Sequence, residues 1–295
     1  MENNNIEEVQ NKLPIGIVTD NACDLGNEIL NEKHVECLHY PVIMGGKLYN
    51  KDDNITVKDL INYADKHKEL PKTSQLTPKD LMEYFKELLT RYEQFIFICL
   101  GSSFSGTLSN AMLVAKELDP EWNKIFVVDS ENLSSGLGLL VLKACKMRDL
   151  GKTAPEIVSE VKRCVPLVRT QFAINTLNYL HMGGRCSGTT RLFGTLLMIK
   201  PIIRVVDGAM VVAKKPIGYS KALESILEYV KSDADNIDPD YVMITHCMAD
   251  KDAVYLRNEL NKFLKCDILQ ETYADVIVST HCGPRTIGVL YILKQ

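Results

Sequence analysis

A continuous apolar run at residues 95–100 constrains the fold of this sequence most. The run reads Phe-Ile-Phe-Ile-Cys-Leu, so a strand formed by it has no polar face and must be covered on both sides. Shorter apolar runs at 15–20 and 125–130 predict two more strands, and helical patterns separate all three. Strands that alternate with helices favour a parallel sheet with helices on both faces. Ligands of such sheets bind at the carboxyl ends of the strands.

The helices of this first region carry recognisable start signals. Thr77 suits an N-cap, Pro78 suits the first helical position, and apolar residues then recur at helical spacing. Further helices are expected after the Gly/Ser loop at 101–107 and over residues 134–151. Another short strand is expected at 40–44, where two glycines follow it.

The pattern changes after about residue 166, which predicts a second unit with a mixed sheet. Asp207-Gly208 between two apolar runs is a strong hairpin signal. No low-complexity linker separates the halves, so we expect them to pack closely. We predict an α/β protein of two domains, residues 13–165 with a parallel sheet and residues 166–295 with a mixed α+β arrangement. The elements expected in the second domain are strands at 201–206, 209–213, 241–246 and 275–280 and helices at 220–231 and 250–264.

Composition and charge exclude several classes of protein. The chain of 295 residues is 46% apolar and 24% charged, values typical of a folded globular protein. Its net charge of −4 argues against a nucleic-acid-binding surface, which needs clustered Lys and Arg. The nine cysteines are odd in number and no two are spaced as CxxC, which favours reduced thiols in the cytoplasm.

The sequence shows no sign of export or of a membrane-spanning segment. Residues 1–12 are polar and acidic, without the basic and apolar regions of a signal peptide. No apolar run approaches the roughly 18 residues that a transmembrane helix needs. We expect a cytoplasmic protein with no transmembrane segment, whose contact with a membrane is transient and confined to the surface.

The first loop that could bind a ligand is residues 101–107, between a buried strand and a helix. Backbone N–H groups, the helix N-terminus and the hydroxyls of Ser102, Ser103 and Ser105 would all favour an anion there. The loop has Thr107 where a phosphate-binding P-loop has lysine, and it does not match the GxSxG nucleophile motif. A Ser-rich helix cap without a ligand is the alternative.

Four further segments offer polar groups near the expected ends of strands or helices. Residues 73–75 (Thr-Ser-Gln) and 130–136 form hydroxyl-rich loops. His281, expected after a strand and before a Gly-Pro turn, could donate a hydrogen bond to a carboxylate or phosphate. Arg185 follows two glycines that end a helix, and it could bind an anion bidentately. Turn formation and helix capping are the alternatives.

Two His-Cys pairs, at 246–247 and 281–282, resemble zinc ligands in type. Adjacent residues of a strand point to opposite faces, so neither pair can easily face one ion, and we expect no metal site. The sequence also lacks GxGxxG and HExxH motifs and the paired carboxylates of a glycosidase. A chain rich in anion donors and poor in bases and nucleophiles favours binding over catalysis.

Taken in order, these segments resemble the DegV family, whose best understood members are the fatty-acid-binding subunits of bacterial fatty acid kinase. The resemblance covers nearly the whole chain, and the motifs follow one another at fitting distances. They are IVTDNACDL at 17–25, TSQ at 73–75, SSFSGT at 102–107, VDS at 128–130, LNYL to GGR at 177–185, KPI to DG at 200–208 and HCGP at 281–284.

The resemblance implies two α/β domains with a long-chain fatty acid buried between them. It also implies that the chain itself does no catalysis, that no cofactor is needed, and that a separate fatty acid kinase subunit phosphorylates the bound acid. Hydroxyls of two loops and one histidine would hold the carboxylate, and an arginine would assist with phosphate or with the partner. Carried over, these residues are Thr73, Ser102, Ser103 and His281, with Ser74 and Ser105 as further candidates, and Arg185.

Two departures from the family pattern leave alternatives open. Lys214-Lys215 stands where the family often has an Arg-containing basic stretch, and Arg285 follows the final Gly-Pro in place of a small residue. Arg285 could add charge to the carboxylate site or face solvent. One alternative is a regulatory module that senses lipid without a kinase partner. The other is an enzyme that acts on an acyl or small anionic substrate through the Ser loops and His281.

Overall fold

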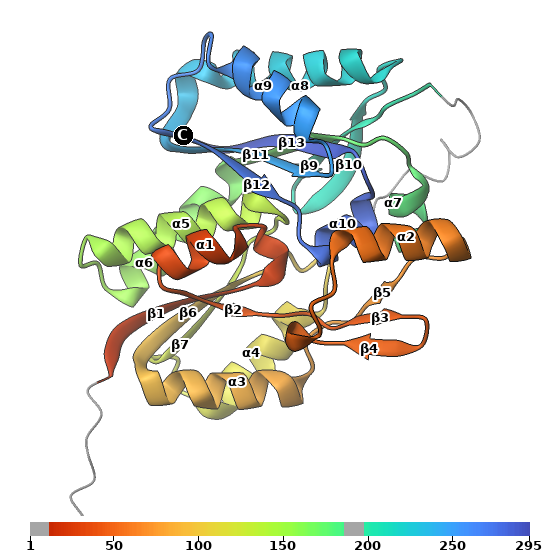
Figure 1. The fold of residues 1–295 in the computed structure, drawn as a ribbon. Helices are drawn as coiled ribbons and strands as arrows, with labels where there is room; N and C mark the ends of the chain where they lie inside the picture. The colour runs from red at the N-terminus through yellow and green to blue at the C-terminus, as the bar shows by residue number, and fades with distance from the viewer. Residues whose placement is uncertain (1–11, 186–197) are drawn as a thin grey trace, which may run out of the picture.

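The first sheet has four strands, all parallel, in the order β2-β1-β6-β7 (Figure 1). The computed structural model describes residues 12–185 and 198–295. The strands of this sheet are β1 (Leu13–Asp20), β2 (Val35–Leu38), β6 (Tyr92–Cys99) and β7 (Ile125–Asp129). The predicted parallel sheet is therefore confirmed.

The side chains of β6 explain why its sequence is apolar throughout. Phe95 and Phe97 pack on one face of the sheet, Ile96 and Ile98 pack on the other, and all four are fully buried. Two helices cover the first face and two cover the second, with a short fifth helix beside the second pair (Figure 1). They are α3 (Pro78–Arg91) and α4 (Thr107–Leu118), then α5 (Ser135–Asp149) and α6 (Ala154–Cys164), and α1 (Gly26–Glu32).

The start of α3 follows the sequence signals. The hydroxyl of Thr77 accepts a hydrogen bond from the backbone N–H of Asp80 at 3.2 Å, and Pro78 occupies the first helical position. The Asp80 carboxylate accepts in return from the Thr77 backbone N–H at 3.1 Å, which completes a capping box. The predicted cap is confirmed.

The second sheet has six strands in the order β10-β9-β8-β13-β11-β12 and is mixed, because β11 and β12 pair in parallel and the other pairs are antiparallel. Asp207 and Gly208 both have positive φ, at 49° and 73°, and they join β9 to β10 as the hairpin signal predicted. The strands are β8 (Val168–Ala173), β9 (Ile202–Val206), β10 (Ala209–Lys214), β11 (Ile237–Cys247), β12 (Ile268–Tyr273) and β13 (Thr286–Leu293).

Helices α8 (Tyr219–Asp233) and α9 (Asp250–Leu260) cover the outer face of the second sheet. Its inner face packs on α5, which thus lies between the two sheets (Figure 1). Apolar residues of α5 share one cluster with Met243 of β11 and Leu290 of β13. Because the second sheet begins at residue 168, we retain the domain boundary near 165 as a proposal.

A small third sheet lies beside the first one and was not expected. It is antiparallel, in the order β4-β3-β5. Along the chain, helix α2 (Val57–His67) connects β4 to β5. The strand predicted at 40–44 is real, but it belongs here rather than to the parallel sheet. The strands are β3 (Val42–Met44), β4 (Lys47–Tyr49) and β5 (Lys72–Thr73).

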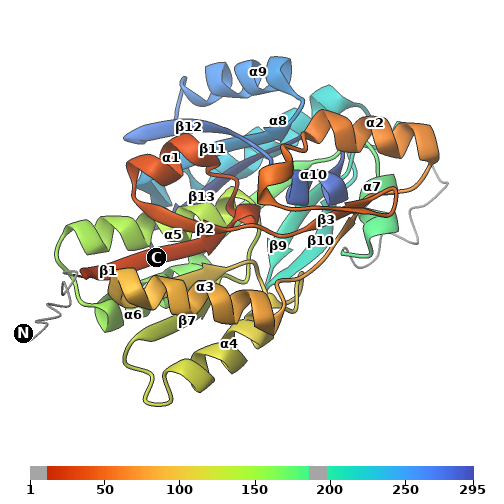
Figure 2. The same cartoon turned by 60° about the horizontal axis from the view of Figure 1, so that its bottom comes forward.

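The strand predicted at 275–280 is wrong, because residues Val276–Cys282 form helix α10. The β-branched run Val-Ile-Val is typical of a strand, but Asp275 caps the segment by accepting a hydrogen bond from the Ile277 N–H at 3.3 Å. Tertiary packing overrides the local preference, because α10 lies against α2 and α7 (Asn178–Gly183), as Figures 1 and 2 show. His281 is therefore on the last turn of a helix and does not follow a strand.

Within residues 12–185 and 198–295, no helix is long and apolar enough to cross a membrane.

Candidate functional site

A cavity of about 330 Å³ opens between the first sheet, the third sheet and α10. All seven residues predicted for the ligand site line it: Thr73, Ser74, Ser102, Ser103, Ser105, Arg185 and His281. Its other walls are largely apolar and include Leu100, Phe104, Leu133, Met210, Ile277 and Val278. One concave surface thus combines clustered polar donors with an aliphatic wall, as small-molecule sites commonly do.

The topology of the first sheet explains why the loops meet here. The chain leaves β1 towards β2 on one side and leaves β6 towards β7 on the other, so the two connections diverge between neighbouring parallel strands. Such a switch point leaves a crevice at the carboxyl ends of the strands. Asp20 ends β1 and accepts a hydrogen bond from the Leu100 N–H, just after β6, at 2.8 Å. This contact fixes the start of the Ser loop that follows.

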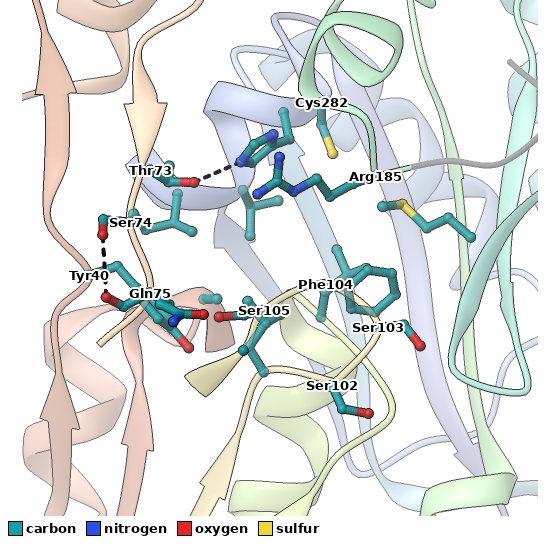
Figure 3. Close-up of a pocket in the computed structure, with 18 residues that line it drawn as sticks. Tyr40, Thr73, Ser74, Gln75, Ser102, Ser103, Phe104, Ser105, Arg185 and Cys282 are labelled. Atoms are coloured by element: carbon teal, nitrogen blue, oxygen red, sulfur yellow. Dashed lines mark hydrogen bonds between the residues drawn. The ribbon is translucent and has the colours of Figure 1, made fainter. Parts of the chain in front are cut away.

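His281 connects two walls of the cavity. Its Nε2 lies 3.0 Å from the hydroxyl of Thr73, although 208 residues separate them (Figure 3). Its Nδ1 is buried and has no hydrogen-bond partner among the described residues. Burial, and then the nearby charge of Arg185, lower the pKa of His281 to about 4, so the ring is neutral at pH 7.

Gly183 allows the backbone of α7 to approach the His281 ring. A Cβ atom at Gly183 would lie 2.5 Å from Nδ1, which no real side chain permits. The next residue, Gly184, ends the helix in the left-handed conformation, as the two glycines predicted. The same turn brings Arg185 to the cavity.

Arg185 fills one of the two roles that the sequence left open, that of a helix cap, and its place at the cavity leaves the other role, anion binding, as a prediction. Its guanidinium donates a hydrogen bond to the carbonyl of Gly183 at 2.5 Å, which satisfies a helix-end acceptor. It also lies beside His281 at the cavity (Figure 3). Within residues 12–185 and 198–295, no carboxylate forms an ion pair with its guanidinium.

The three serines of the Ser loop are not equivalent. Ser105 accepts a hydrogen bond from the Thr107 N–H at 3.2 Å and lies 3.0 Å from the Thr107 hydroxyl. Ser102 and Ser103 are exposed, and their hydroxyls point away from His281 (Figure 3). Ser105 thus accepts from the first N–H of α4, although the N-cap residue itself is Gly106, which has no capping side chain. Of the three serines, Ser105 alone turns its hydroxyl towards Gln75 (Figure 3).

Two polar residues of the cavity wall were missed by sequence reasoning. Gln75 belongs to the Thr-Ser-Gln motif but was not selected; it packs against Gly106, where a Cβ atom would lie 2.1 Å from its Oε1. Tyr40 donates a hydrogen bond to Asp20 at 3.0 Å. Burial raises the pKa of Asp20 to about 6 and that of Tyr40 well above its usual range. No sequence pattern links Tyr40 to the site, because it precedes the unexpected third sheet.

The described residues contain no group of three or more His, Cys, Asp or Glu side chains that could hold a metal ion. His246 lies on β11, where it accepts from the Ala249 N–H at 3.2 Å and lies 3.3 Å from Glu271. The strand argument against zinc does not apply at 281–282, since these residues are helical.

Comparison with known proteins agrees with this fold. The family model described as "Uncharacterised protein, DegV family" matches residues 14–294. A DegV domain-containing protein of Clostridium acetobutylicum is 35% identical over 286 residues, which cover 95% of this chain and 99% of that protein.

Solved structures of similar chains carry the same architecture. A DegV family protein from Thermus thermophilus, described in terms of its fatty acid binding, has a TM-score of 0.88 at 26% identity and covers 95% of this chain and 100% of its own. DegV of Bacillus subtilis, described as a fatty acid binding protein, has a TM-score of 0.82 at 27% identity, with coverages of 96% and 100%. These findings confirm the predicted fold and the resemblance, and the chain belongs to the DegV family.

Proposed function

We propose that this protein binds a long-chain fatty acid in the cavity, with the carboxylate among Thr73, His281 and Arg185. One observation carries the proposal: a hydroxyl, an imidazole and a guanidinium from three separate elements converge at a cavity whose other walls are largely apolar. The fatty acid binding described for the Thermus thermophilus and Bacillus subtilis relatives supports it. Ser74 and Ser105 complete the proposed head-group site, whereas Ser102 and Ser103 line the cavity with exposed hydroxyls that point away from its centre.

The physical chemistry of a fatty acid fits such a site. Burying the acyl chain gains about 0.8 kcal/mol per CH₂ group, so a chain of about 16 carbons contributes roughly 10 kcal/mol before ordering costs. The carboxylate loses its hydration at the same time and needs donors to replace water. Arg185 supplies a charge, and the hydrogen-bonded pair of Thr73 and His281 supplies one neutral donor. That donor is the Nδ1–H of His281 when Thr73 donates to Nε2, and the Thr73 hydroxyl when Nε2–H donates to Thr73.

We further propose that the protein presents the carboxylate to a separate kinase subunit, which forms the acyl phosphate. Arg185 is exposed, and Thr73 and Ser74 are half-buried, so the head-group end of the cavity reaches solvent. Lys214, which stands where the family often has an Arg-containing basic stretch, forms an ion pair with Glu228 at 2.7 Å and does not line the cavity. Incubating the loaded protein with the kinase subunit of its source cell and ATP should give acyl phosphate. No product with any kinase subunit would favour the lipid-sensing module.

One observation bears on the enzyme alternative. The 3.0 Å between Thr73 Oγ1 and His281 Nε2 suits a nucleophile and its base. An activated pair also needs a group that orients the base, but among the described residues nothing partners His281 Nδ1. Binding without catalysis is therefore the function that the geometry supports best. Turnover of acyl esters or acyl phosphates by the protein alone would overturn this preference.

The decisive test identifies what the purified protein carries. Protein prepared without added lipid should release about one fatty acid per chain on denaturation and extraction, as identified by mass spectrometry. His281→Ala should lower fatty-acid affinity about tenfold or more, because a hydrogen bond to a charged group is lost. The exposed His67 on α2 provides the matched control as His67→Ala. An empty extract from folded protein that also fails to bind added fatty acid would refute the proposal.

A further inference from the structure

A group of buried polar residues lies behind the cavity, where the first sheet meets α10. We call it the carboxyl junction; it consists of Asn21, Asp24, Ser134 and Asp275. The Asp24 carboxylate accepts a hydrogen bond from the Ser134 hydroxyl at 2.5 Å and another from the Asp275 backbone N–H at 2.7 Å. The Asn21 side-chain amide donates to the Asp275 carboxylate at 2.8 Å. The junction thus joins the loop after β1, the start of α5 and the start of α10.

The junction fixes one end of a helix whose other end carries His281. Asp275 is the N-cap of α10, and His281 lies in the last turn of that helix. Ile277 and Val278 of α10 also line the cavity. A helix of seven residues has little stability of its own, so its position depends on its contacts. Displacing the N-cap would therefore move the imidazole away from Thr73.

The junction buries two carboxyl groups, which costs free energy unless hydrogen bonds replace their hydration. Asp24 is 2% exposed, and no Lys or Arg within the described ranges pairs with Asp24 or Asp275. Burial raises the pKa of Asp24 well above its usual range and that of Asp275 to about 6. Directional hydrogen bonds from N–H and O–H groups hold these carboxyls in place, so the junction sets the position of α10 more sharply than apolar contact alone.

We propose that Asp24 is a positioning residue for the fatty-acid site, which holds Asp275 and α10 so that His281 stays against Thr73. This inference rests on the proposed function. Asp24 does not line the cavity, so its effect on the fatty-acid carboxylate is transmitted through α10.

The experiment uses full-length, delipidated protein and palmitate labelled with ¹³C at the carboxyl carbon. Asp24→Ala should weaken palmitate binding about tenfold and shift the bound carboxyl resonance, because His281 is displaced. Asp24→Asn should restore affinity to within about threefold, since an amide oxygen can still accept from the Asp275 N–H. Equal affinity and an unshifted resonance in Asp24→Ala would overturn the inference.

Asp119 provides a matched control for general loss of stability. Asp119 is 4% exposed and does not line the cavity. Its carboxylate accepts hydrogen bonds from the Lys124 and Ile125 N–H groups, at 2.7 and 2.9 Å. Asp119→Ala should leave palmitate affinity within about twofold of wild type. An equal loss in Asp119→Ala and Asp24→Ala would reduce Asp24 to a structural role and overturn the inference.

A second variant covers the case in which Asp24→Ala does not fold. Asn21→Ala removes only the 2.8 Å bond to Asp275 and the bond from the Tyr40 N–H, and should weaken binding about threefold with a shift of the same sign. Unchanged binding in Asn21→Ala would then count as refutation. If wild-type protein itself binds no palmitate or other fatty acid, the proposed function fails, and that result is distinct from wild-type binding with no effect of the variants.

Discussion

The cavity and the carboxyl junction lie at the two ends of α10 and use polar groups in opposite ways. In the cavity, and within the described part of the chain, His281 Nδ1 has no hydrogen-bond partner and Arg185 has no carboxylate partner. In the junction, Asp24 accepts two hydrogen bonds and Asn21 both donates and accepts. Spare hydrogen-bonding capacity at a concave surface points to a ligand, whereas complete satisfaction points to a structural role.

The strongest way to break this comparison is to fill the cavity without touching its polar groups. Val278 lines the cavity from α10, so Val278→Trp should occupy the space of the acyl chain and lower fatty-acid affinity about 100-fold or more. Calorimetric titration of delipidated protein with a fatty acid measures the loss.

Val254→Trp is the control for this substitution. Val254 lies on α9 and is 55% exposed, so the same change there should alter affinity by less than about twofold. Wild-type affinity in Val278→Trp would show that the acyl chain lies elsewhere.

A second variant pair compares hydroxyls inside the cavity. Thr73→Val removes the hydroxyl that contacts His281 and should weaken binding about fivefold to tenfold. Ser102→Ala removes an exposed hydroxyl that points away from His281 and should change affinity by less than about twofold (Figure 3). If Ser102→Ala has the larger effect, the carboxylate binds at the Ser loop and the arrangement around His281 is not the head-group site.

A third comparison concerns the pH dependence of stability, in which the two regions differ in sign. The pKa of His281 is lowered to about 4, so its contribution to stability is present above the ordinary pKa of 6.5 and is lost as pH falls through about 4. The pKa of Asp275 is raised to about 6, so its contribution is present below the ordinary 3.8 and is lost as pH rises through about 6.

Urea unfolding at about pH 7.5 and about pH 4.5 would separate these contributions. On acidification, His281→Gln should lose less stability than wild type. Asp275→Asn should lose more stability than wild type, because it lacks the group that is stabilising when protonated. Asparagine is also a good N-cap residue, so the start of α10 is preserved in this variant. An identical change in the free energy of unfolding between the two pH values in all three proteins would show that neither group is buried as described.

Local signals in the sequence were sufficient for much of the fold. The apolar run of β6, the Thr77 cap and the Asp207-Gly208 hairpin each encode their structure within a few residues. The segment Val276–Cys282 was misread because its β-branched residues favour a strand, while Asp275 and the packing of α10 decide for a helix. The third sheet was missed because strands of two or three residues leave almost no periodic signal.

The candidate site was predictable in its residue types but not in its geometry. The motifs identified seven residues, and the structure shows that all seven line one cavity. The sequence of the Ser loop does not show that Ser102 and Ser103 turn away from His281. Arg285 illustrates the same limit, because its sequence position left two roles open. It pairs with Asp252 at 2.9 Å and stacks on Tyr219 at 4.0 Å, and it does not line the cavity.

The order of the site residues along the sequence has a consequence for synthesis. Thr73, the Ser loop and Arg185 are all translated before His281, which lies 208 residues after Thr73. N-terminal regions fold first as a polypeptide emerges from the ribosome. The parallel sheet can therefore form on the nascent chain while the proposed head-group site still lacks its imidazole. That site is assembled only after the ribosome has added α10.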